Sequence, residues 1–261
     1  MLILAPSTVP VQITLSAHTL SQALGKAIMR STVLQKEVCI ILPALNEEAT
    51  VGKVIAEIPR QTLEEKGYKV TILVVDNGSS DRTREKALQS GAEVIVEPRR
   101  GKGRAVRTAL EQVKADFVFM LDSDYTYPAT YILQMLEILE QGTPVVIGSR
   151  LKGCVEKGAM STLNLIGNHL LSSMASIIYR MKITDLCTGL WGFRNQAIKN
   201  LELKANGFDF EAELFAQLAK KGYRIAEIPV HYRPRPTKAK LNSIKDGLKI
   251  GWKLLTQRLS G

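Results

Sequence analysis

Two carboxylates, Asp122 and Asp124, follow the apolar run FVFML (117–121) at positions i and i+2. In an extended chain this spacing places both side chains on the same side. Paired carboxylates repel each other unless a cation lies between them, and Mg²⁺ or Mn²⁺ prefers oxygen ligands, including those of a diphosphate. We therefore predict that Asp122 and Asp124 bind such an ion, with Asp124 next to the reacting group. The alternative is that the two acids only form a turn and a helix cap before Pro128.

Further candidate residues follow two earlier apolar runs, at 38–42 and 70–75. Pro43, Leu45 and Glu47 come after the first run, and Asp76 comes at the end of the second. A backbone turn at the first position could border a nucleobase, with Glu47 near the ribose. Asp76 could accept hydrogen bonds from the base or the ribose. The alternatives are an ordinary helix start for the first segment and an Asx-turn for Asp76.

The segment RRGKGRA (99–105) is basic and rich in glycine. Its spacing matches neither the phosphate-loop motif nor the dinucleotide-binding fingerprint. Its glycines could let backbone amides approach an anion, which Lys102 would neutralise. The alternative is a solvated basic turn.

Three later segments add candidate residues. Arg150 follows another apolar run, where its guanidinium could bind a phosphate through two parallel hydrogen bonds. Asp185 could act as a base or contact a sugar hydroxyl, and the alternative is a turn acid. In the amphipathic segment 208–222, Glu211 and Glu213 are predicted to be exposed.

The elements that must position these residues alternate along the chain. Apolar, β-branched runs occur at 38–42, 70–75, 93–96, 117–121 and 144–148, and helical patterns occur near 47–58, 81–90, 102–114 and 129–141. Asn46 precedes Glu47 and Glu48, which predicts a helix start. This alternation predicts an α/β fold with a mainly parallel open sheet and helices on both faces. In such sheets ligands bind beyond the carboxyl ends of the strands, where the candidate residues are found.

Composition narrows the class of protein. The chain has 261 residues, of which 45% are hydrophobic and 23% charged, which excludes a disordered chain or a disulfide scaffold. The net charge of +10 suits an anionic partner such as a nucleotide, a phosphate, a nucleic acid or an acidic membrane. Nucleic-acid binding is disfavoured because only 6% of residues are aromatic and the bases cluster at strand ends and in the tail.

Three parts of the chain are expected. Residues 1–36 form an N-terminal extension, residues 37–235 form the α/β domain, and residues 236–261 form a basic amphipathic tail. The tail sets Ile244, Leu248 and Trp252 against lysines, so it could lie on an anionic membrane or pack on the protein's own core. No run is long and apolar enough to cross a bilayer, and the leading residues lack the basic charge of a secretory signal. We expect a cytoplasmic protein with possible peripheral contact at the cytoplasmic face of a membrane.

Several motifs occur together in one order: PALNEE (43–48), VVDNGSSD (74–81), RGKGRA (100–105), DSD (122–124) and GSR (148–150). Together they resemble the nucleotide-sugar half of the GT-A glycosyltransferases of family 2. TDLCTGLWGFR (184–194) and the basic segment RPRPTKAKLNS (233–243) resemble the polyprenyl-phosphate (dolichol-phosphate) mannose or glucose synthase branch. The resemblance covers roughly residues 37–250.

The resemblance implies the GT-A fold and a role for each matching residue. Pro43, Leu45, Glu47 and Asp76 would line the nucleotide of a UDP- or GDP-hexose, Asp122 and Asp124 would bind Mg²⁺ or Mn²⁺, Arg150 would hold an acceptor phosphate, and Lys240 would belong to a loop over the phosphates. The branch often has Gln where this chain has Thr126, and a second acceptor-binding arginine expected near 160–170 is missing from the sequence.

The expected activity is inverting transfer of a hexose to a polyprenyl phosphate. An acceptor phosphate is already ionised, whereas a hydroxyl acceptor would need a base, for which Asp185 is the candidate. One alternative is a GT-A enzyme with a soluble acceptor, such as phosphoglycerate or a polysaccharide precursor. Another is a nucleotidyltransferase, which would release diphosphate instead of a nucleoside diphosphate.

Overall fold

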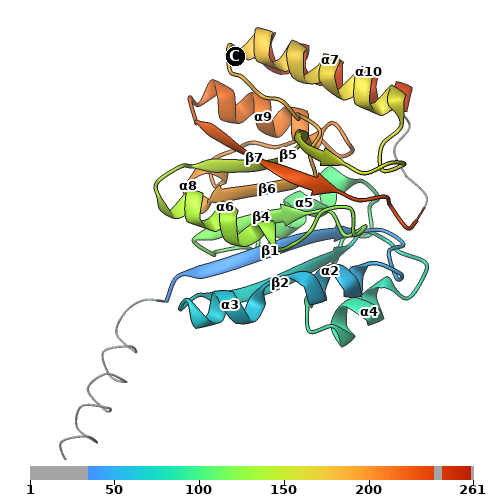
Figure 1. Ribbon diagram of the computed structural model, residues 1–261, viewed down its shortest axis with the longest axis vertical. Coiled ribbons are helices and arrows are strands. Elements are labelled where there is room, and N and C mark those ends of the chain that lie inside the picture. Colours follow the sequence, from blue (N-terminus) through green and yellow to red (C-terminus); the bar gives the residue numbers. More distant parts are fainter. Residues whose placement is uncertain (1–34, 238–242, 260–261) are drawn as a thin grey trace, which may run out of the picture. The chain divides into compact units, whose positions relative to one another are not determined.

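The computed structural model describes residues 35–237 and 243–259, and Figure 1 shows their arrangement. A seven-stranded sheet has the strand order β3-β2-β1-β4-β6-β5-β7. The strands are β1 (Glu37–Ala44), β2 (Lys69–Asp76), β3 (Glu93–Val96), β4 (Phe117–Leu121), β5 (Val145–Val155), β6 (Leu190–Arg194) and β7 (Ile225–Tyr232). Each strand predicted from an apolar run is present.

All neighbouring strands are parallel except at β6, which runs antiparallel to both β4 and β5. Because β1, β2 and β4 are mutually parallel, their carboxyl ends lie at one edge of the sheet. Pairing of Ala44 with Asp76 puts the residues that follow β1 and β2 side by side at that edge. The mainly parallel open sheet predicted from the sequence is confirmed.

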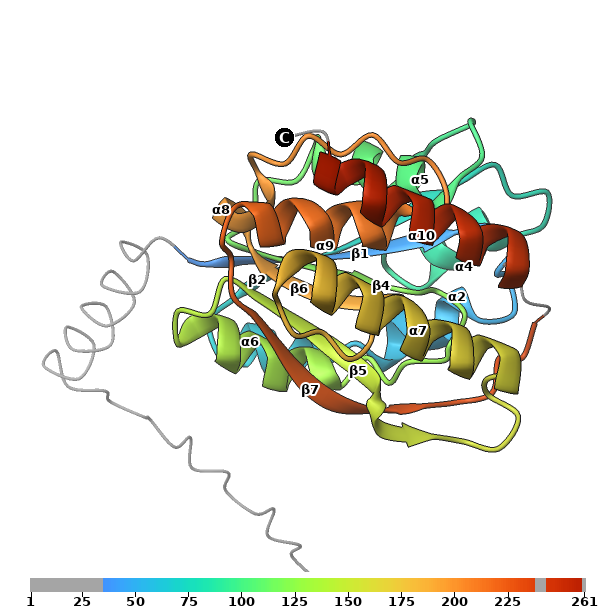
Figure 2. The same cartoon turned by 90° about the horizontal axis from the view of Figure 1, so that it is seen from above.

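Helices cover both faces of the sheet, over two separate apolar cores (Figure 2). One face carries α2 (Val51–Glu57), α3 (Arg60–Glu65), α4 (Thr83–Gln89) and α6 (Tyr131–Glu140). The other carries α5 (Lys102–Leu110), α7 (Thr162–Tyr179), α8 (Asn195–Ile198), α9 (Phe210–Lys220) and α10 (Ser243–Leu259). Strands β1 and β4 are buried on both faces, which explains why their sequences are apolar almost throughout.

The predicted helix start at Asn46 is wrong. Helix α2 begins five residues later, at Val51, and Asn46 has a φ of 50°, outside the conformation of an N-cap. Its side chain instead accepts a hydrogen bond of 2.8 Å from the Ser80 backbone amide. Asn46 therefore links the loop after β1 to the loop after β2. Both loops lie at the edge of the sheet where the carboxyl ends of β1, β2 and β4 meet.

The C-terminal helix α10 packs against α7 and α9. Lys249 contacts Asp209 at 2.9 Å, and Lys253 contacts Asp209 and Glu213 at 3.4 and 3.5 Å, so part of its basic face serves to dock α10 on α9. Within the described residues, no helix combines the length and apolarity needed to cross a bilayer. The predicted extension 1–36 lies almost wholly outside the described residues, and Lys240 lies outside them.

Candidate functional site

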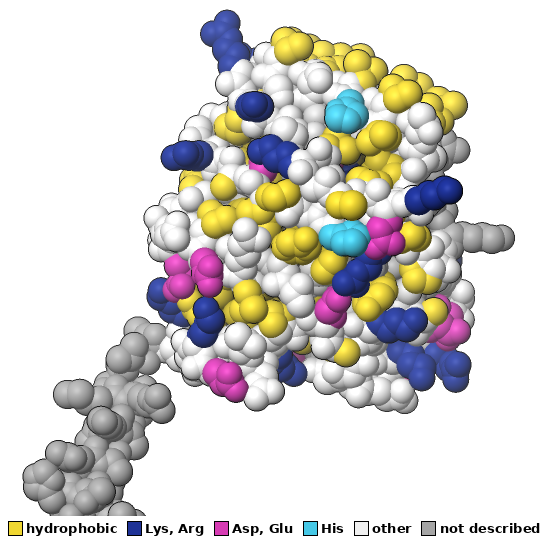
Figure 3. All heavy atoms as spheres, viewed as in Figure 1, with side chains coloured by type: hydrophobic (Ala, Val, Ile, Leu, Met, Phe, Trp, Pro, Cys, Tyr) yellow, Lys and Arg dark blue, Asp and Glu magenta, His cyan; other side chains and the backbone are white. Residues whose placement is uncertain are grey.

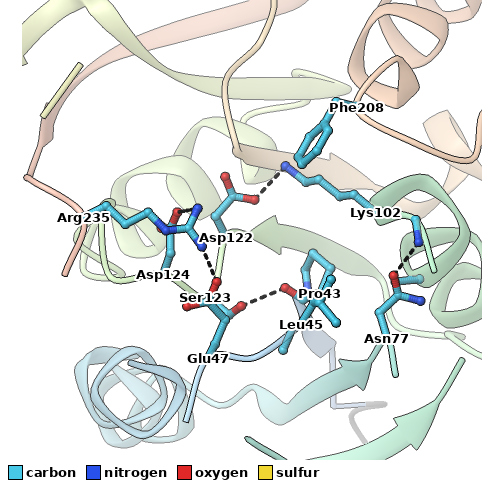
Figure 4. Close-up of a pocket in the computed structure, with 13 residues that line it drawn as sticks. Pro43, Leu45, Glu47, Asn77, Lys102, Asp122, Ser123, Asp124, Phe208 and Arg235 are labelled. Carbon is cyan, nitrogen blue, oxygen red and sulfur yellow. Dashed lines mark hydrogen bonds and ion pairs between the residues drawn. The ribbon is translucent and has the colours of Figure 1, made fainter. Parts of the chain in front are cut away.

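A cavity of about 240 Å³ lies beyond the carboxyl ends of β1, β2 and β4 (Figure 4). The loops after these strands and the start of α5 supply most of its wall. It is lined by Pro43, Ala44, Leu45, Glu47, Asn77, Gly101, Lys102, Ala105, Asp122, Ser123, Asp124, Phe208 and Arg235. We call it the first cavity. It brings together six of the residues singled out from the sequence, drawn from segments up to 81 positions apart: Pro43, Leu45, Glu47, Lys102, Asp122 and Asp124.

One side of the first cavity carries a buried lysine between two acids. The Lys102 ammonium lies 2.6 Å from a carboxylate oxygen of Asp122 and 2.6 Å from one of Glu211. Burial alone would lower the pKa of Lys102, but the two carboxylates outweigh it and raise that pKa above its usual value. Burial raises the pKa of Glu211, although Lys102 opposes this effect. Lys102 therefore stays charged and holds Asp122 in place.

The opposite side carries an arginine between two acids. The Arg235 guanidinium lies 3.1 Å from Asp124 Oδ2 and contacts a carboxylate oxygen of Glu47, as Figure 4 shows. The Thr126 hydroxyl donates a hydrogen bond of 2.6 Å to the other Asp124 oxygen. Burial and the neighbouring Asp122 raise the pKa of Asp124 above its usual value, against the lowering effect of Arg235.

The Asp122–Asp124 pair fits a divalent ion that is shared with a ligand. Among the described residues, no cluster of three or more His, Cys, Asp or Glu side chains is placed to hold a metal by itself. Mg²⁺ and Mn²⁺ commonly take only one or two protein carboxylates and complete their coordination with phosphate oxygens and water. Two carboxylates lining one open cavity match that donor set.

The end of β2 brings Asn77, instead of the predicted Asp76, to the first cavity. Asp76 does not line the first cavity; its carboxylate accepts a 3.0 Å hydrogen bond from the Ser79 amide, the Asx-turn alternative. Asn77 lines the cavity instead, donates to the carbonyls of Glu97 and Arg99, and accepts a 2.6 Å hydrogen bond from the Gly101 amide. Sequence reasoning missed Asn77, although it stands directly after a buried strand.

The glycines of the basic segment serve close packing. A Cβ on Gly101 would lie 2.1 Å from the Asn206 carbonyl oxygen, and one on Gly103 would lie 2.4 Å from that of Ala205. Gly101 also has a φ of 138°, which a side chain would disfavour. These glycines bring the start of α5, and so Lys102, against the loop before α9.

A second cavity of about 230 Å³ adjoins the first. Five side chains line both cavities and form the boundary between them: Lys102, Asp122, Asp124, Phe208 and Arg235. The rest of the second cavity comes mainly from α7, α10 and the loop before α7, including the apolar residues Met160, Leu163, Leu171 and Ile250. Arg150 and Glu211 supply additional charge, and Arg150 lies 5.2 Å from the centre of the Tyr232 ring.

Asp185 holds Arg150. The carboxylate is fully buried and accepts hydrogen bonds of 2.7 and 2.6 Å from the Arg150 guanidinium, 2.8 Å from the Arg150 amide and 2.6 Å from the Asn168 amide group. Burial would lower the pKa of Arg150, but Asp185 outweighs it and raises that pKa well above its usual value. Asp185 lines neither cavity. This geometry favours a positioning role for Asp185 over the predicted alternatives of base or sugar contact.

The prediction that Glu211 and Glu213 are exposed is wrong. Both are buried, with 4% and 0% of their surface accessible. Glu211 pairs with Lys102, and Glu213 accepts hydrogen bonds from the backbone amides of Lys204 and Ala205 at 2.7 and 2.6 Å. Their helix α9 is covered by α10, so its polar side meets charged partners instead of solvent.

Comparisons with known proteins show which sequences this chain is similar to. The sequence profile described as "Glycosyl transferase family 2" matches residues 39–202. The chain is 37% identical over 213 residues to the Haloferax volcanii protein named glycosyltransferase AglJ, covering 80% of this chain and 68% of that protein. It is 34% identical to a Haloferax volcanii protein named dolichyl-phosphate hexose transferase, covering 82% and 91%.

The fold is also similar to that of solved structures. Glucosyl-3-phosphoglycerate synthase from Mycobacterium tuberculosis, crystallised with Mn²⁺, UDP-glucose and phosphoglyceric acid, superposes with a TM-score of 0.65 at 21% identity, covering 90% of this chain and 83% of that one. The predicted GT-A fold is confirmed.

Proposed function

The chain belongs to glycosyl transferase family 2, and from this premise we propose that it transfers a hexose from a UDP- or GDP-sugar to a polyprenyl phosphate of the dolichyl type. The observation that carries this proposal is the shared boundary of the two cavities. The first cavity is acidic and suits a metal-bound diphosphate, and the second joins a buried arginine to an apolar wall. A group transferred between ligands in the two cavities would react at that boundary.

In this proposal the first cavity binds the donor. Pro43, Leu45 and Glu47 border the nucleoside, and Asn77 fixes the loop beside it. Asp122 and Asp124 would hold Mg²⁺ or Mn²⁺, which neutralises negative charge on a departing nucleoside diphosphate. Lys102 keeps Asp122 oriented toward the cavity and adds positive charge at the boundary. The Mn²⁺ and UDP-glucose bound to the mycobacterial synthase support this assignment.

The second cavity would bind the acceptor phosphate at Arg150. Asp185 and Asn168 hold the guanidinium from behind, so the arginine loses little freedom when a phosphate binds. A phosphate oxygen, already ionised, would attack the anomeric carbon as the bond from that carbon to the diphosphate breaks, with inversion. No base is needed, which agrees with the absence of Asp185 from both cavity walls. The relative named dolichyl-phosphate hexose transferase supports a lipid phosphate acceptor.

The apolar part of the acceptor would leave between α7 and α10. Met160, Leu163, Leu171 and Ile250 line this part of the second cavity. Gly167 on α7 and Gly247 on α10 line it too, and a Cβ at either position would meet no neighbouring atom within 4 Å. Two glycines facing open space widen the gap between the helices, as an isoprenoid chain requires.

The outer faces of the same helices support the proposal of peripheral membrane contact. Large apolar side chains are exposed at regular helical spacing on both, and Figure 3 shows hydrophobic side chains gathered along the top edge over α7 and α10. They are Leu163, Ile166, Leu170 and Ile177 on α7 and Ile244, Leu248, Trp252, Leu255 and Leu259 on α10. Adjacent exposed apolar stripes of this size are typical of a surface that lies in a membrane interface. We propose that this surface contacts the cytoplasmic face of a membrane.

The test combines purified protein with UDP- and GDP-sugars, Mg²⁺ or Mn²⁺, and two phosphate acceptors, a short polyprenyl phosphate and 3-phosphoglycerate. We expect glycosylation of the polyprenyl phosphate and release of a nucleoside diphosphate. Transfer of the nucleoside monophosphate to the acceptor, with release of hexose 1-phosphate, would identify a nucleotidyltransferase. Transfer only to 3-phosphoglycerate would identify the soluble-acceptor activity, for which the mycobacterial synthase is the precedent. The apolar wall of the second cavity favours the lipid.

A further inference from the structure

Arg235 lies against an acid that the proposed function assigns to the metal ion, Asp124. Its guanidinium contacts Glu47 and lies 3.1 Å from Asp124, and its side chain lines both cavities. The Thr237 hydroxyl accepts a hydrogen bond of 2.9 Å from Arg235 Nε and donates one of 3.3 Å to the second Glu47 oxygen. Glu47 and Asp124, the buried acids on this side of the first cavity, therefore both contact the Arg235 guanidinium.

The segment that carries Arg235 is fixed at one end. Arg233 forms an ion pair of 2.7 Å with Glu57 and lies 4.8 Å from the centre of the Tyr125 ring, and its amide donates a 2.9 Å hydrogen bond to the Thr126 carbonyl. Arg235 follows two residues later. Its side chain can leave the acids while Arg233 keeps the end of β7 in place.

Lys102 is less free than Arg235 to leave its carboxylate partners. It extends from the first residue of α5, is only 14% exposed, and also pairs with buried Glu211. Arg235 is 21% exposed and lies on the segment after β7. Of the two cations that hold the Asp122–Asp124 pair, Arg235 is therefore the one placed to move.

A divalent ion and Arg235 compete for Asp124. Two cations beside one carboxylate oxygen repel each other, and a metal without nucleotide would have to displace the guanidinium from a buried acid. A nucleoside diphosphate changes this balance because its phosphate oxygens give the displaced guanidinium a new anionic partner.

We propose that Arg235 is a resident counter-cation of the donor site, which excludes the metal ion until a nucleoside diphosphate arrives with it. This inference rests on the proposed function, since it takes Asp122 and Asp124 as the metal ligands. As a consequence, binding of the metal ion and binding of the nucleotide are positively coupled through one side chain, that of Arg235. Each ligand then raises the affinity for the other by the same factor.

The experiment measures Mn²⁺ binding to the full chain by the electron paramagnetic resonance signal of free Mn²⁺, with and without UDP or GDP. Wild-type protein should bind Mn²⁺ weakly alone and more tightly with the matching nucleoside diphosphate. In Arg235→Gln, binding of Mn²⁺ alone should tighten about tenfold, and the added effect of nucleotide should shrink by a similar factor, within the range usual for coupled sites. Thr237→Val, which removes the hydroxyl that accepts from Arg235 and donates to Glu47 but keeps the guanidinium, should shift both in the same direction by less.

Arg82→Gln is the matched control, because it removes one positive charge from an exposed arginine that pairs with Glu48 outside the first cavity. An equal gain in Mn²⁺ affinity in this control would mean that the loss of any positive charge favours Mn²⁺ binding, and it would overturn the inference. Unchanged binding of Mn²⁺ alone by a folded Arg235→Gln, beside nucleotide-dependent binding by the wild type, would overturn the inference and leave the metal site intact. If no protein binds Mn²⁺ with either nucleotide, the proposed metal site itself is wrong.

Discussion

The two cavities share five side chains at their boundary, yet different structural elements and different types of side chain line the rest of each. The first is formed largely by short loops that follow parallel strands, and its acids each have a cationic partner within the wall. The second is formed largely by α7 and α10, and there Arg150, held by buried Asp185 behind the wall, lies among apolar residues. One cavity is organised by charge and the other by shape and apolar surface.

This difference matches what the two halves of a transfer reaction require. A departing diphosphate needs fixed charges and dipoles that are in place before the reaction. A lipid acceptor needs one anchor for its head group and a path for its chain. The comparison therefore predicts that changes in the first cavity act on every acceptor, whereas changes in α7 and α10 act only on lipid acceptors.

The largest effect is expected from Asp124→Asn in the first cavity. The change keeps the size of the side chain but removes the charge that a divalent ion needs, so turnover should fall by roughly 10²–10³-fold with any acceptor. Steady-state kinetics at saturating Mn²⁺ measures it. The matched control is Asp76→Asn, another acid at a strand end, whose side chain lines neither cavity and can still accept the hydrogen bond from Ser79.

The Asp76→Asn control also distinguishes two interpretations of Asp76, one from the sequence and one from the structure. Sequence reasoning places Asp76 at the nucleotide, whereas its observed hydrogen bond makes it part of a turn. Nearly unchanged turnover in Asp76→Asn would support the turn. A loss comparable to that of Asp124→Asn would support the predicted contact of Asp76 with the donor. Full activity of Asp124→Asn would contradict the proposed metal site.

An intermediate effect is expected from replacing one exposed leucine on each helix beside the second cavity, Leu170→Gln with Leu248→Gln. These side chains are 68% and 73% exposed, so the fold should tolerate both changes. Loss of two apolar side chains from a membrane interface should weaken vesicle binding on the order of 10²-fold, and lipid glycosylation in vesicles should fall with it. Flotation with anionic vesicles measures binding.

Leu88→Gln is the control for this pair, because Leu88 is also exposed, at 52%, but lies on α4. A detergent-soluble short-chain polyprenyl phosphate should be glycosylated at the wild-type rate by all three proteins. Unchanged flotation of the double variant would show that this surface does not contact the membrane.

Sequence reasoning succeeded where a local pattern determines the structure. The apolar runs predicted the strands, and the rule that ligands bind beyond their carboxyl ends located Glu47, Lys102, Asp122 and Asp124 at one cavity. The antiparallel strand β6 was missed, although it completes the sheet between β4 and β5. Its five residues, LWGFR, carry no periodic signal strong enough to predict a strand.

The second cavity could not be predicted, because tertiary packing decides which side of a helix is buried. Glu211 has the local pattern of an exposed acid, and only the approach of Lys102 from α5 buries it as a paired group. Arg235 likewise stands in a basic segment that gives no hint of its contact with Glu47, 188 positions away. Close approach between distant segments is visible in the folded chain alone.

The smallest effect on turnover is expected from Asp185→Asn, behind the arginine that lines the second cavity. Arg150 would keep its place through the remaining hydrogen bonds but lose its buried counter-charge, so the KM for a lipid phosphate should rise about tenfold while the donor KM stays unchanged. Removing one partner of a buried ion pair should also lower the free energy of unfolding by about 3 kcal/mol. Acceptor-dependent kinetics and thermal unfolding measure the two effects.

These paired measurements separate positioning from base catalysis. If Asp185 orients Arg150, kcat at saturating acceptor should remain near the wild-type value and the melting temperature should fall. If Asp185 instead removes a proton from a hydroxyl acceptor, kcat should collapse at every acceptor concentration, and its pH dependence should lose the limb set by the base. Four hydrogen bonds already converge on this carboxylate and none of its surface is accessible, so we expect the first result.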